Sequence, residues 1–183
     1  RQVQSNLAIT YENLGRLDEA LRLTRDVYTG FLKLFGEEHQ QTLLAANNYA
    51  SSLNRLERFG EAKSLLRKTV PATRRILGES NVGTLRTRSV YAEALYRDDG
   101  ATFDDLHEAV TTLEEIEQTA RRVFGGAHPI TKGIERELQV SRAALRAARA
   151  SEAMLKGDVN AMREAMAAMA AGDAQEGSKL NTK

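Results

Sequence analysis

Apolar residues recur along the chain at the spacing of amphipathic helices. The first two stripes are Leu7, Tyr11 and Leu14, followed by Leu23, Val27, Phe31 and Leu34. Positions i, i+3, i+4 and i+7 lie on one face of a helix, so each stripe predicts a helix with one buried side. Small residues beside the stripes, Ala8 and Ala20, would let two such helices approach closely. Gly15 lies where the first helix should end.

The two stripes return twice more. The later members are Tyr49, Leu53 and Leu56 with Leu66, Val70 and Ile76, and then Tyr91 and Leu95 with Leu113, Ile116, Ala120 and Val123. This alternation predicts an all-α chain of helix pairs near 1–15/17–35, 41–57/59–77 and 83–97/103–124, with a longer helix from about 129. Gly60, like Gly15, marks a predicted turn between two helices.

Pro71 lies inside the second helix of the second pair. Proline removes one backbone hydrogen bond and clashes with the carbonyl group four residues earlier, which here belongs to Arg67. We therefore expect a kink or a broken turn between these two residues.

One phrase of the sequence recurs at a fixed distance. Residues 36–53 read GEEHQQTLLAANNYASSL and residues 78–95 read GESNVGTLRTRSVYAEAL, and seven positions agree at an offset of 42. Gly125, His128 and Thr131 repeat part of the phrase at an offset of 47. The five additional residues fit in the polar stretch DDGATFDD at 98–105. A period of this length is typical of a repeat architecture.

A pair of amphipathic helices cannot bury both apolar faces alone, so successive pairs must stack. We therefore expect one solenoid over residues 1–172 and a disordered tail at 173–183. Its units are expected at about 1–40, 41–82, 83–128 and 129–172. The sequence begins with Arg1, so we expect it to be a piece of a longer protein.

The fourth unit departs from the pattern, because Gln139 stands where the earlier units carry a small alanine. Met162, Met166 and Met169 share one face of a short final helix. We expect this helix to cap the solenoid, with Met162 and Met166 against the helix that begins near 129. Methionine also adapts to irregular partners, so partner binding or self-association through this helix is the alternative.

Composition narrows the classes of partner. The 183 residues contain 26 Lys and Arg against 25 Asp and Glu, a formal net charge of +1. This balance gives no electrostatic reason to expect nucleic acid or an anionic membrane as a partner. Cysteine is absent, which excludes disulfides, thiolate zinc sites and cysteine nucleophiles and indicates a reducing compartment such as the cytoplasm. No apolar run approaches the ~20 residues that a membrane span needs.

No group of residues resembles an active site. His39 and His128 occupy the same position of the repeat, which is Asn81 in the unit between them. Because asparagine replaces histidine there, a helix-capping role is favoured over metal binding or acid–base chemistry. The acidic stretch 98–105 fails as a calcium loop, since its twelfth position is Ala109 where a bidentate glutamate is needed. We expect no catalytic residue, no metal and no cofactor, and therefore no enzyme.

The repeat resembles the tetratricopeptide repeat family, in the long-repeat form found in kinesin light chains and their relatives. The family motif N-L-A-x-x-Y…L-G-x-x-x-E-A is present as Asn6-Leu7-Ala8, Tyr11, Leu14-Gly15 and Glu19-Ala20. The inter-repeat phrase L-G-x-x-H-P-x-T is present as Phe124-Gly125, His128-Pro129 and Thr131. The resemblance implies a right-handed α-α superhelix of about three and a half to four helix pairs, with the first helix of each pair lining a concave wall.

On that architecture, the stripe opposite the packing stripe of each first helix faces a groove. The groove positions are Gln2, Asn6, Ile9 and Asn13, then Leu44, Asn48, Ser51 and Arg55, then Arg86, Val90, Glu93 and Arg97. The resemblance implies that Asn6 and Asn48 hydrogen-bond the backbone of an extended peptide, as an amide both donates and accepts. The alternative is that both asparagines stabilise neighbouring helices. The expected site residues are Asn6, Asn13, Asn48, Ser51, Arg55, Arg86 and Glu93.

We therefore expect a protein–protein interaction scaffold that binds a peptide or partner protein in the groove, as part of a larger intracellular protein. The alternative is a structural or oligomerisation segment, or a regulatory domain, with no peptide ligand of its own.

Overall fold

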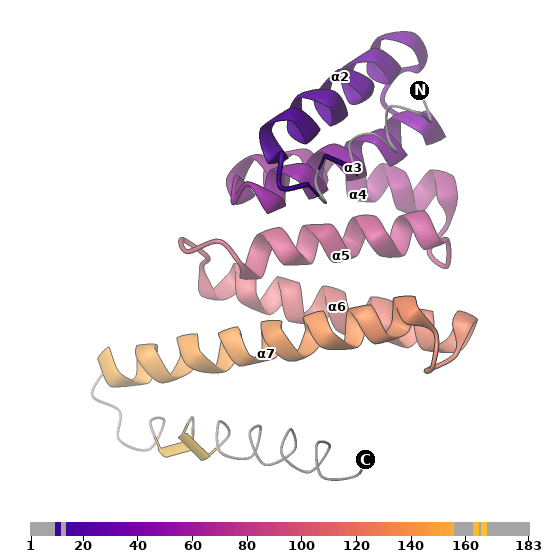
Figure 1. Ribbon diagram of the computed structural model, residues 1–183. Helices are drawn as coiled ribbons and strands as arrows, with labels where there is room; N and C mark the ends of the chain where they lie inside the picture. Colours follow the sequence, from indigo (N-terminus) through magenta and orange to yellow (C-terminus); the bar gives the residue numbers. More distant parts are fainter. Residues whose placement is uncertain (1–9, 12–13, 156–162, 165, 168–183) are drawn as a thin grey trace.

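The computed structural model describes residues 10–11, 14–155, 163–164 and 166–167. In this part of the chain all regular structure is helical (Figure 1). The helices are α2 Leu17–Phe35, α3 Gln40–Arg55, α4 Phe59–Leu77, α5 Val82–Tyr96, α6 Phe103–Phe124 and α7 Pro129–Leu155. The predicted all-α class and these predicted helices are confirmed. Of the helix expected near 1–15, only Thr10, Tyr11, Leu14 and Gly15 are described. Thr10 and Tyr11 are helical, and Leu14 and Gly15 belong to a turn.

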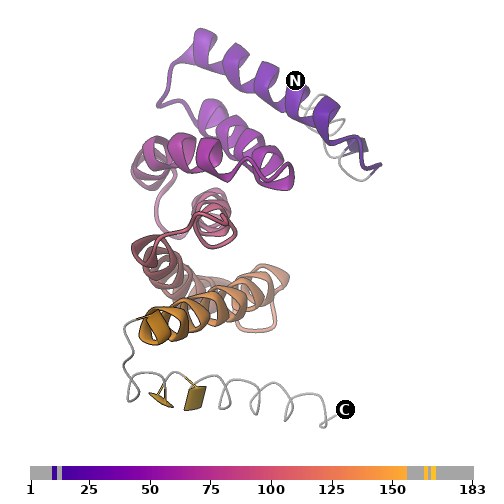
Figure 2. The same cartoon turned by 90° about the vertical axis from the view of Figure 1, so that its left-hand side faces the viewer.

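The helices stack in sequence order. Each helix contacts the next, and in addition α3 contacts α5 and α5 contacts α7. Figures 1 and 2 show the pairs following one another along the stack, from α2 at one end to α7 near the other. The first helices of successive pairs therefore lie side by side. We call the surface of α3, α5 and α7 that faces away from α4 and α6 the inner wall.

Small residues lie where the helices cross. The recurring alanines are completely buried, at Ala20, Ala50, Ala62, Ala92 and Ala109. With only a methyl group at these positions, neighbouring backbones approach closely and the larger side chains interdigitate around them. The largest of these hydrophobic side chains are also completely or almost completely buried. They are Leu53, Leu66, Leu85, Leu95, Leu113 and Ile116. The residues that recur with the repeat period thus form one continuous hydrophobic core.

The predicted stripes of the second helices extend one turn too far. Leu34, Ile76 and Val123 close these stripes, yet their side chains are 59%, 43% and 45% exposed. All three lie in the last turn of their helices. Helical spacing predicts which face of a helix is apolar, but burial also needs a neighbouring helix beside that turn. Leu14, the last member of the first stripe, is exposed as well.

The sequence predicted a kink or a broken turn at Pro71. The broken turn is wrong, and the kink stays a prediction. Helix α4 continues from Phe59 to Leu77 with the proline inside it. Pro71 and Arg67 are both exposed, so water can reach the Arg67 carbonyl oxygen that the proline leaves without a backbone partner. The loss of one bond on the solvent side is therefore tolerated by a helix whose other face is packed.

The recurring segment supplies the N-terminal caps of α3, α5 and α7, as predicted. Nδ1 of His39, Oδ1 of Asn81 and Nδ1 of His128 each accept a hydrogen bond from the backbone N–H two residues further on, at 3.2, 2.7 and 3.2 Å. Each cap satisfies an N–H group that has no partner within its helix. The two imidazole rings also stack on Phe35 and Phe124, with ring centroids 4.4 and 5.0 Å apart. Both histidines therefore have a structural role.

The turn between α3 and α4 differs from its expected form. Gly60 is the second residue of α4, whereas the residue in the left-handed conformation is Glu57, with a φ of 58°. In the first unit the left-handed residue is Gly15, as the sequence indicated, with a φ of 73°. The two units therefore make the same turn with different residue types.

The five-residue insertion connects α5 to α6 and is held by α4. Thr102 and Asp105 form a reciprocal capping box at the start of α6. Nζ of Lys63 lies 2.8 Å from a carboxylate oxygen of Asp98 and 3.7 Å from one of Asp105. The hydrogen bond from Lys63 holds the pKa of Asp98 below its usual value. The acidic stretch thus contributes a helix cap, through Asp105, and not a calcium loop.

The packing expected for the methionine helix is not found where it can be checked. Met166 is 66% exposed, so its side chain does not pack against α7 as predicted. Helix α7 instead packs against α6 and α5, which already cover Ile134, Leu138 and Leu145. Met162 and Met169 lie outside the described residues, as does the tail at 173–183.

Candidate functional site on the inner wall

Five of the seven predicted site residues can be placed, and all five belong to helices of the inner wall. Asn48, Ser51 and Arg55 lie on α3, and Arg86 and Glu93 lie on α5. Asn48, Arg55 and Arg86 are exposed, while Ser51 and Glu93 are half-buried. Asn6 and Asn13 lie outside the described residues. Because α3 contacts α5, these positions belong to one continuous surface.

Glu93 already has partners within the fold. Nδ2 of Asn54 donates to one of its carboxylate oxygens at 3.1 Å, and the guanidinium of Arg97 donates to the other at 2.7 Å. The same amide nitrogen donates to the Val90 carbonyl oxygen at 3.0 Å. Asn54 is 1% exposed and lies on α3, so it ties α3 to α5 through two acceptors. Glu93 is therefore part of a hydrogen-bond network between α3 and α5 that the sequence did not reveal.

A second polar contact joins α5 to α7. The Ser89 hydroxyl donates to a carboxylate oxygen of Glu137. These two residues border a pocket of about 180 Å³ between the helices, with Arg86 on its α5 side and Gly133 on its α7 side. A side chain on Gly133 would meet open space. Arg86 thus stands beside an open hollow of the inner wall.

Sequence reasoning missed Ser89, Gly133 and Glu137. A signal was present for two of them, because the offset of 47 leads from Arg86 to Gly133 and from Val90 to Glu137. Both are the fourth-unit members of the groove stripe. Ser89 lies next to that stripe and gave no repeat signal. Its contact with Glu137 depends on how close α5 and α7 come.

Burial is the main cause of the shifted pKa values of Glu137 and Tyr96 in this part of the wall. It raises the pKa of Glu137, against the effect of the Ser89 hydrogen bond, and the negative charge of Glu93 raises it further. Burial also raises the pKa of Tyr96 to about 12, with the two glutamates adding to the effect. Among the described residues, the charge that opposes this rise of the Glu137 pKa is that of Arg136 on the same helix. The α5–α7 side of the wall therefore holds a carboxylate that lacks a strong cationic partner among the described residues.

We expect the Glu137→Gln variant to be more stable than the wild type at pH 7. A carboxyl group whose pKa is raised by folding binds its proton more tightly in the folded state, so the wild type loses stability as the pH rises through that pKa. The advantage of the variant should disappear below about pH 4, where the carboxyl group is protonated in both states. Urea unfolding of the variant and the wild type at pH values from about 4 to 7 measures this difference in stability. A variant that is less stable at pH 7 would show that the Ser89 hydrogen bond outweighs the burial of charge.

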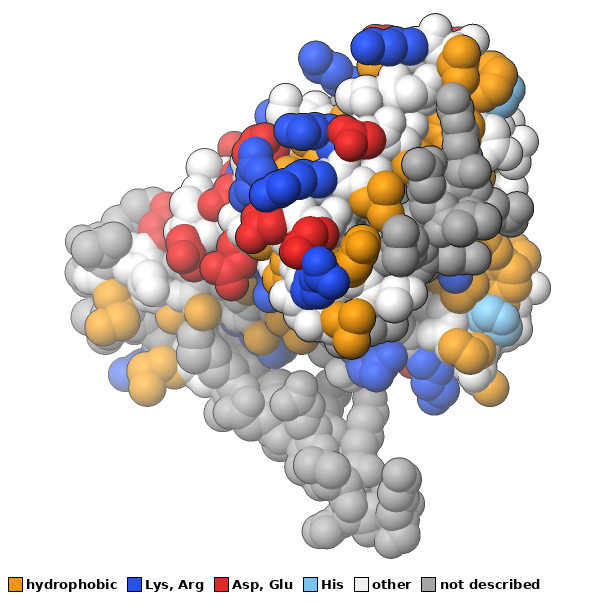
Figure 3. Space-filling view, turned by 45° about the horizontal axis from the view of Figure 1, so that its top comes forward, with side chains coloured by type: hydrophobic (Ala, Val, Ile, Leu, Met, Phe, Trp, Pro, Cys, Tyr) orange, Lys and Arg blue, Asp and Glu red, His pale blue; other side chains and the backbone are white. Residues whose placement is uncertain are grey.

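Nothing in the described part of the chain indicates catalysis. No group of three or more His, Cys, Asp or Glu side chains is placed there to hold a metal ion. None of the described helices is long and apolar enough to cross a membrane. On the face shown in Figure 3, basic and acidic side chains lie next to one another, so that face is mixed in charge.

Comparison with known proteins agrees with this arrangement. Residues 1–72 match the tetratricopeptide repeat family. No curated protein matches the chain significantly. Tetratricopeptide repeats are in general protein–protein interaction modules and are typically not catalytic.

Three solved structures share the fold. A Podosopora anserina protein assigned as a kinesin light chain, with nearly identical TPR-like repeats, superposes with a TM-score of 0.70 at 20% identity, covering 96% of this chain and 95% of that one. A variant of that protein gives 0.70 at 19% identity, with 97% and 96% covered. BtubC (BKLC) from P. vanneervenii gives 0.60 at 16% identity, covering 96% of this chain and 64% of that one. At these identities the likeness establishes the fold alone.

Proposed function

We propose that this tetratricopeptide repeat protein binds an extended segment of a partner protein along its inner wall. Support comes from the exposed stripe that runs from Asn48 on α3 to Arg86 on α5 and ends at the open pocket between α5 and α7. The amide of Asn48, the cation of Arg86 and the pocket suit a peptide. Its backbone needs hydrogen-bond donors and acceptors, and its side chains need a pocket.

The proposed binding unit is the whole array of residues 1–172, within a larger intracellular protein. Asn48 is the residue proposed to hydrogen-bond the peptide backbone. The wall offers Val90 at the equivalent position of α5 and Glu137 on α7, so the backbone contacts of the ligand are concentrated at α3. Arg86 has no carboxylate partner among the described residues, so it is the cation available to an acidic residue of the ligand.

The test uses a peptide selected against the full chain from a random library. Removing one hydrogen bond to a ligand costs about 1 kcal/mol, so Asn48→Ala should weaken binding by about fivefold while the melting temperature stays nearly unchanged. Gln118→Ala, which shortens an exposed amide on α6, is the matched control and should change neither quantity. A lower melting temperature with unaltered affinity would assign Asn48 to helix packing. The proposal would be contradicted if no selected peptide bound with an affinity that depends on Asn48 or Arg86.

One observation favours the second candidate, a self-association segment. Met154 and Met166 are 64% and 66% exposed, and exposed methionine suits an adaptable apolar contact. A chain that dimerises in light scattering, and whose selected peptides bind equally well after Asn48→Ala, would support this alternative.

A further inference from the structure

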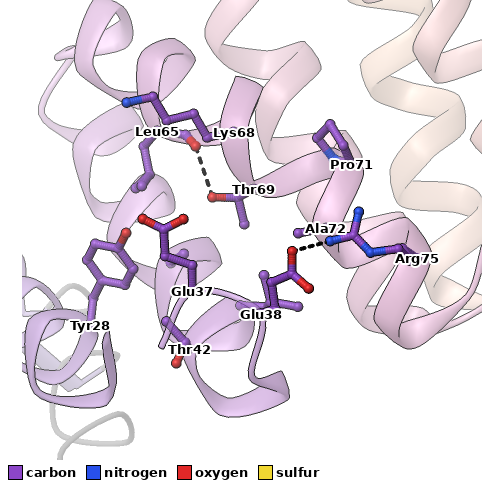
Figure 4. A pocket seen from close by; sticks show the side chains of 12 residues that line it. Tyr28, Glu37, Glu38, Thr42, Leu65, Lys68, Thr69, Pro71, Ala72 and Arg75 are labelled. Carbon is purple, nitrogen blue, oxygen red and sulfur yellow. Dashed lines mark hydrogen bonds and ion pairs between the residues drawn. The ribbon is translucent and has the colours of Figure 1, made fainter. Parts of the chain in front are cut away.

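The opposite side of the array contains a second pocket, which the inner wall does not use. It lies between α2 and α4, has a volume of about 180 Å³ and is lined by Tyr28 of α2, Ala46 of α3 and Lys68 of α4. The loop after α2 adds Glu37 and Glu38 (Figure 4). We call it the outer pocket. The repeat supplies a filled counterpart of this pocket within the same chain.

The counterpart lies one unit later and is filled by Arg88. The repeat offset of 42 leads from Ala46 to Arg88, whose side chain is 7% exposed and pairs with Glu115 of α6. A second carboxylate, that of Glu79, lies 3.7 Å from the same guanidinium. Between α4 and α6 an arginine therefore occupies the space that remains open between α2 and α4.

The outer pocket keeps one of the two acidic partners. Glu37 is the repeat equivalent of Glu79, and Figure 4 shows its carboxylate pointing into the space between Tyr28 and Thr69. Glu38 is engaged by Arg75 instead. The hydroxyl of Tyr28 lies near Glu37, whose negative charge, after burial, raises the pKa of the tyrosine.

The other acidic partner is replaced. Lys68 stands at the position of Glu115, and Figure 4 places its ammonium at the edge of the pocket, on the side away from Arg75. Lys68 is exposed, so water screens much of its charge. It limits the attraction of the pocket for a cation without removing the carboxylate of Glu37.

The wall of the outer pocket also contains a buried hydroxyl group without a partner. Thr42 is 1% exposed, and its Oγ1 makes no hydrogen bond to another described residue. Its repeat equivalents behave differently, because Thr84 and Thr131 donate to the carbonyl oxygens of Gly78 and Gly125 at 2.7 and 2.9 Å. A buried hydroxyl that is left unpaired is unfavourable. The first copy of the recurring segment thus departs from the other two at a position that borders the pocket.

We propose that the outer pocket receives an arginine side chain of a partner protein, in the place that Arg88 fills within the chain one unit later. The planar guanidinium can donate to Glu37 and stack on the Tyr28 ring, while its stem lies against Ala46 and Leu65. A carboxylate ligand would be repelled by Glu37, and an apolar one would leave Glu37 and Thr42 without partners. The site is separate from the inner wall, so it can bind whether or not the groove is occupied.

The probe is N-acetyl-arginine methylamide, titrated into the full chain and followed by amide chemical shifts in NMR spectra. The neutral isostere N-acetyl-citrulline methylamide is the control ligand. The arginine probe should shift the amides of Glu37 and Ala46, and the citrulline probe should not. Lys68→Glu restores the second acidic partner and should tighten binding by about fivefold. Glu37→Gln should abolish the difference between the two probes.

Ala46→Arg supplies the arginine from within the chain and should prevent binding of the probe. The double variant Ala46→Arg, Lys68→Glu reproduces the arrangement around Arg88 and should also raise the melting temperature above that of Lys68→Glu alone. This second readout keeps the test decisive if Ala46→Arg alone folds poorly. Equal shifts with both probes, or no shift at Glu37 and Ala46 in either the wild type or Lys68→Glu, would overturn the proposal.

Discussion

Replacing Leu95 with alanine is expected to lower the free energy of unfolding by about 2–5 kcal/mol. The side chain is completely buried in α5, the helix that contacts α3, α4, α6 and α7. A cavity at this position loses the transfer free energy of the removed groups and weakens packing on both sides of the stack. For a chain of this length each kcal/mol corresponds to about 2–4 °C. The melting temperature should therefore fall by roughly 4–20 °C.

Leu34→Ala is the matched control. It removes the same atoms from a side chain that is 59% exposed, so the free energy of unfolding should change by no more than about 0.5 kcal/mol. Urea unfolding followed by circular dichroism measures both variants. Similar losses for the two would mean that α5 is not the centre of a continuous core.

Replacing Pro71 with alanine is expected to stabilise the protein by about 1–3 kcal/mol. The variant supplies the N–H group that can donate to the Arg67 carbonyl oxygen, and it removes the steric conflict of the ring in the middle of α4. The greater freedom of alanine in the unfolded chain offsets about 0.4–1 kcal/mol of this gain. Because Pro71 is exposed, no core contact is lost.

Gln118→Pro is the reverse experiment. The offset of 47 makes Gln118 the α6 equivalent of Pro71, and it is likewise exposed. Its replacement should cost about 3 kcal/mol or more. Thermal unfolding of the two variants should therefore move in opposite directions. A Pro71→Ala variant that melts earlier than the wild type would show that the proline is needed for a specific shape of α4.

The local features of the fold could be read from the sequence because their causes are local. The positions of α2 to α6 follow from the 3.6-residue spacing of apolar side chains. The capping of α3, α5 and α7 followed from one comparison, the exchange of His39 and His128 for Asn81 in the same place of the repeat. Composition and period together also predicted an all-α array, because no single helix pair can bury both of its faces.

Other features depend on which helix lies beside which, and a repeat pattern does not contain that information. Leu34, Ile76 and Val123 continue their stripes in the sequence but extend beyond their neighbours. Asn54 reads as an ordinary polar residue, yet it is buried because its amide meets Val90 and Glu93 across the α3–α5 contact.

The sequence alone therefore determined the helices, the caps of α3, α5 and α7 and the order of the helices in the array, since the helices and these caps depend on residues a few positions apart. The tertiary structure decided which polar groups are buried and which pockets are open. Ala46 and Arg88 occupy one position of the repeat, but only the packing of α2 and α4 around the first, and of α4 and α6 around the second, makes one an open pocket and the other a buried ion pair. The physical reason is that burial and charge pairing are set by distances between helices, which the order of residues along one helix does not specify.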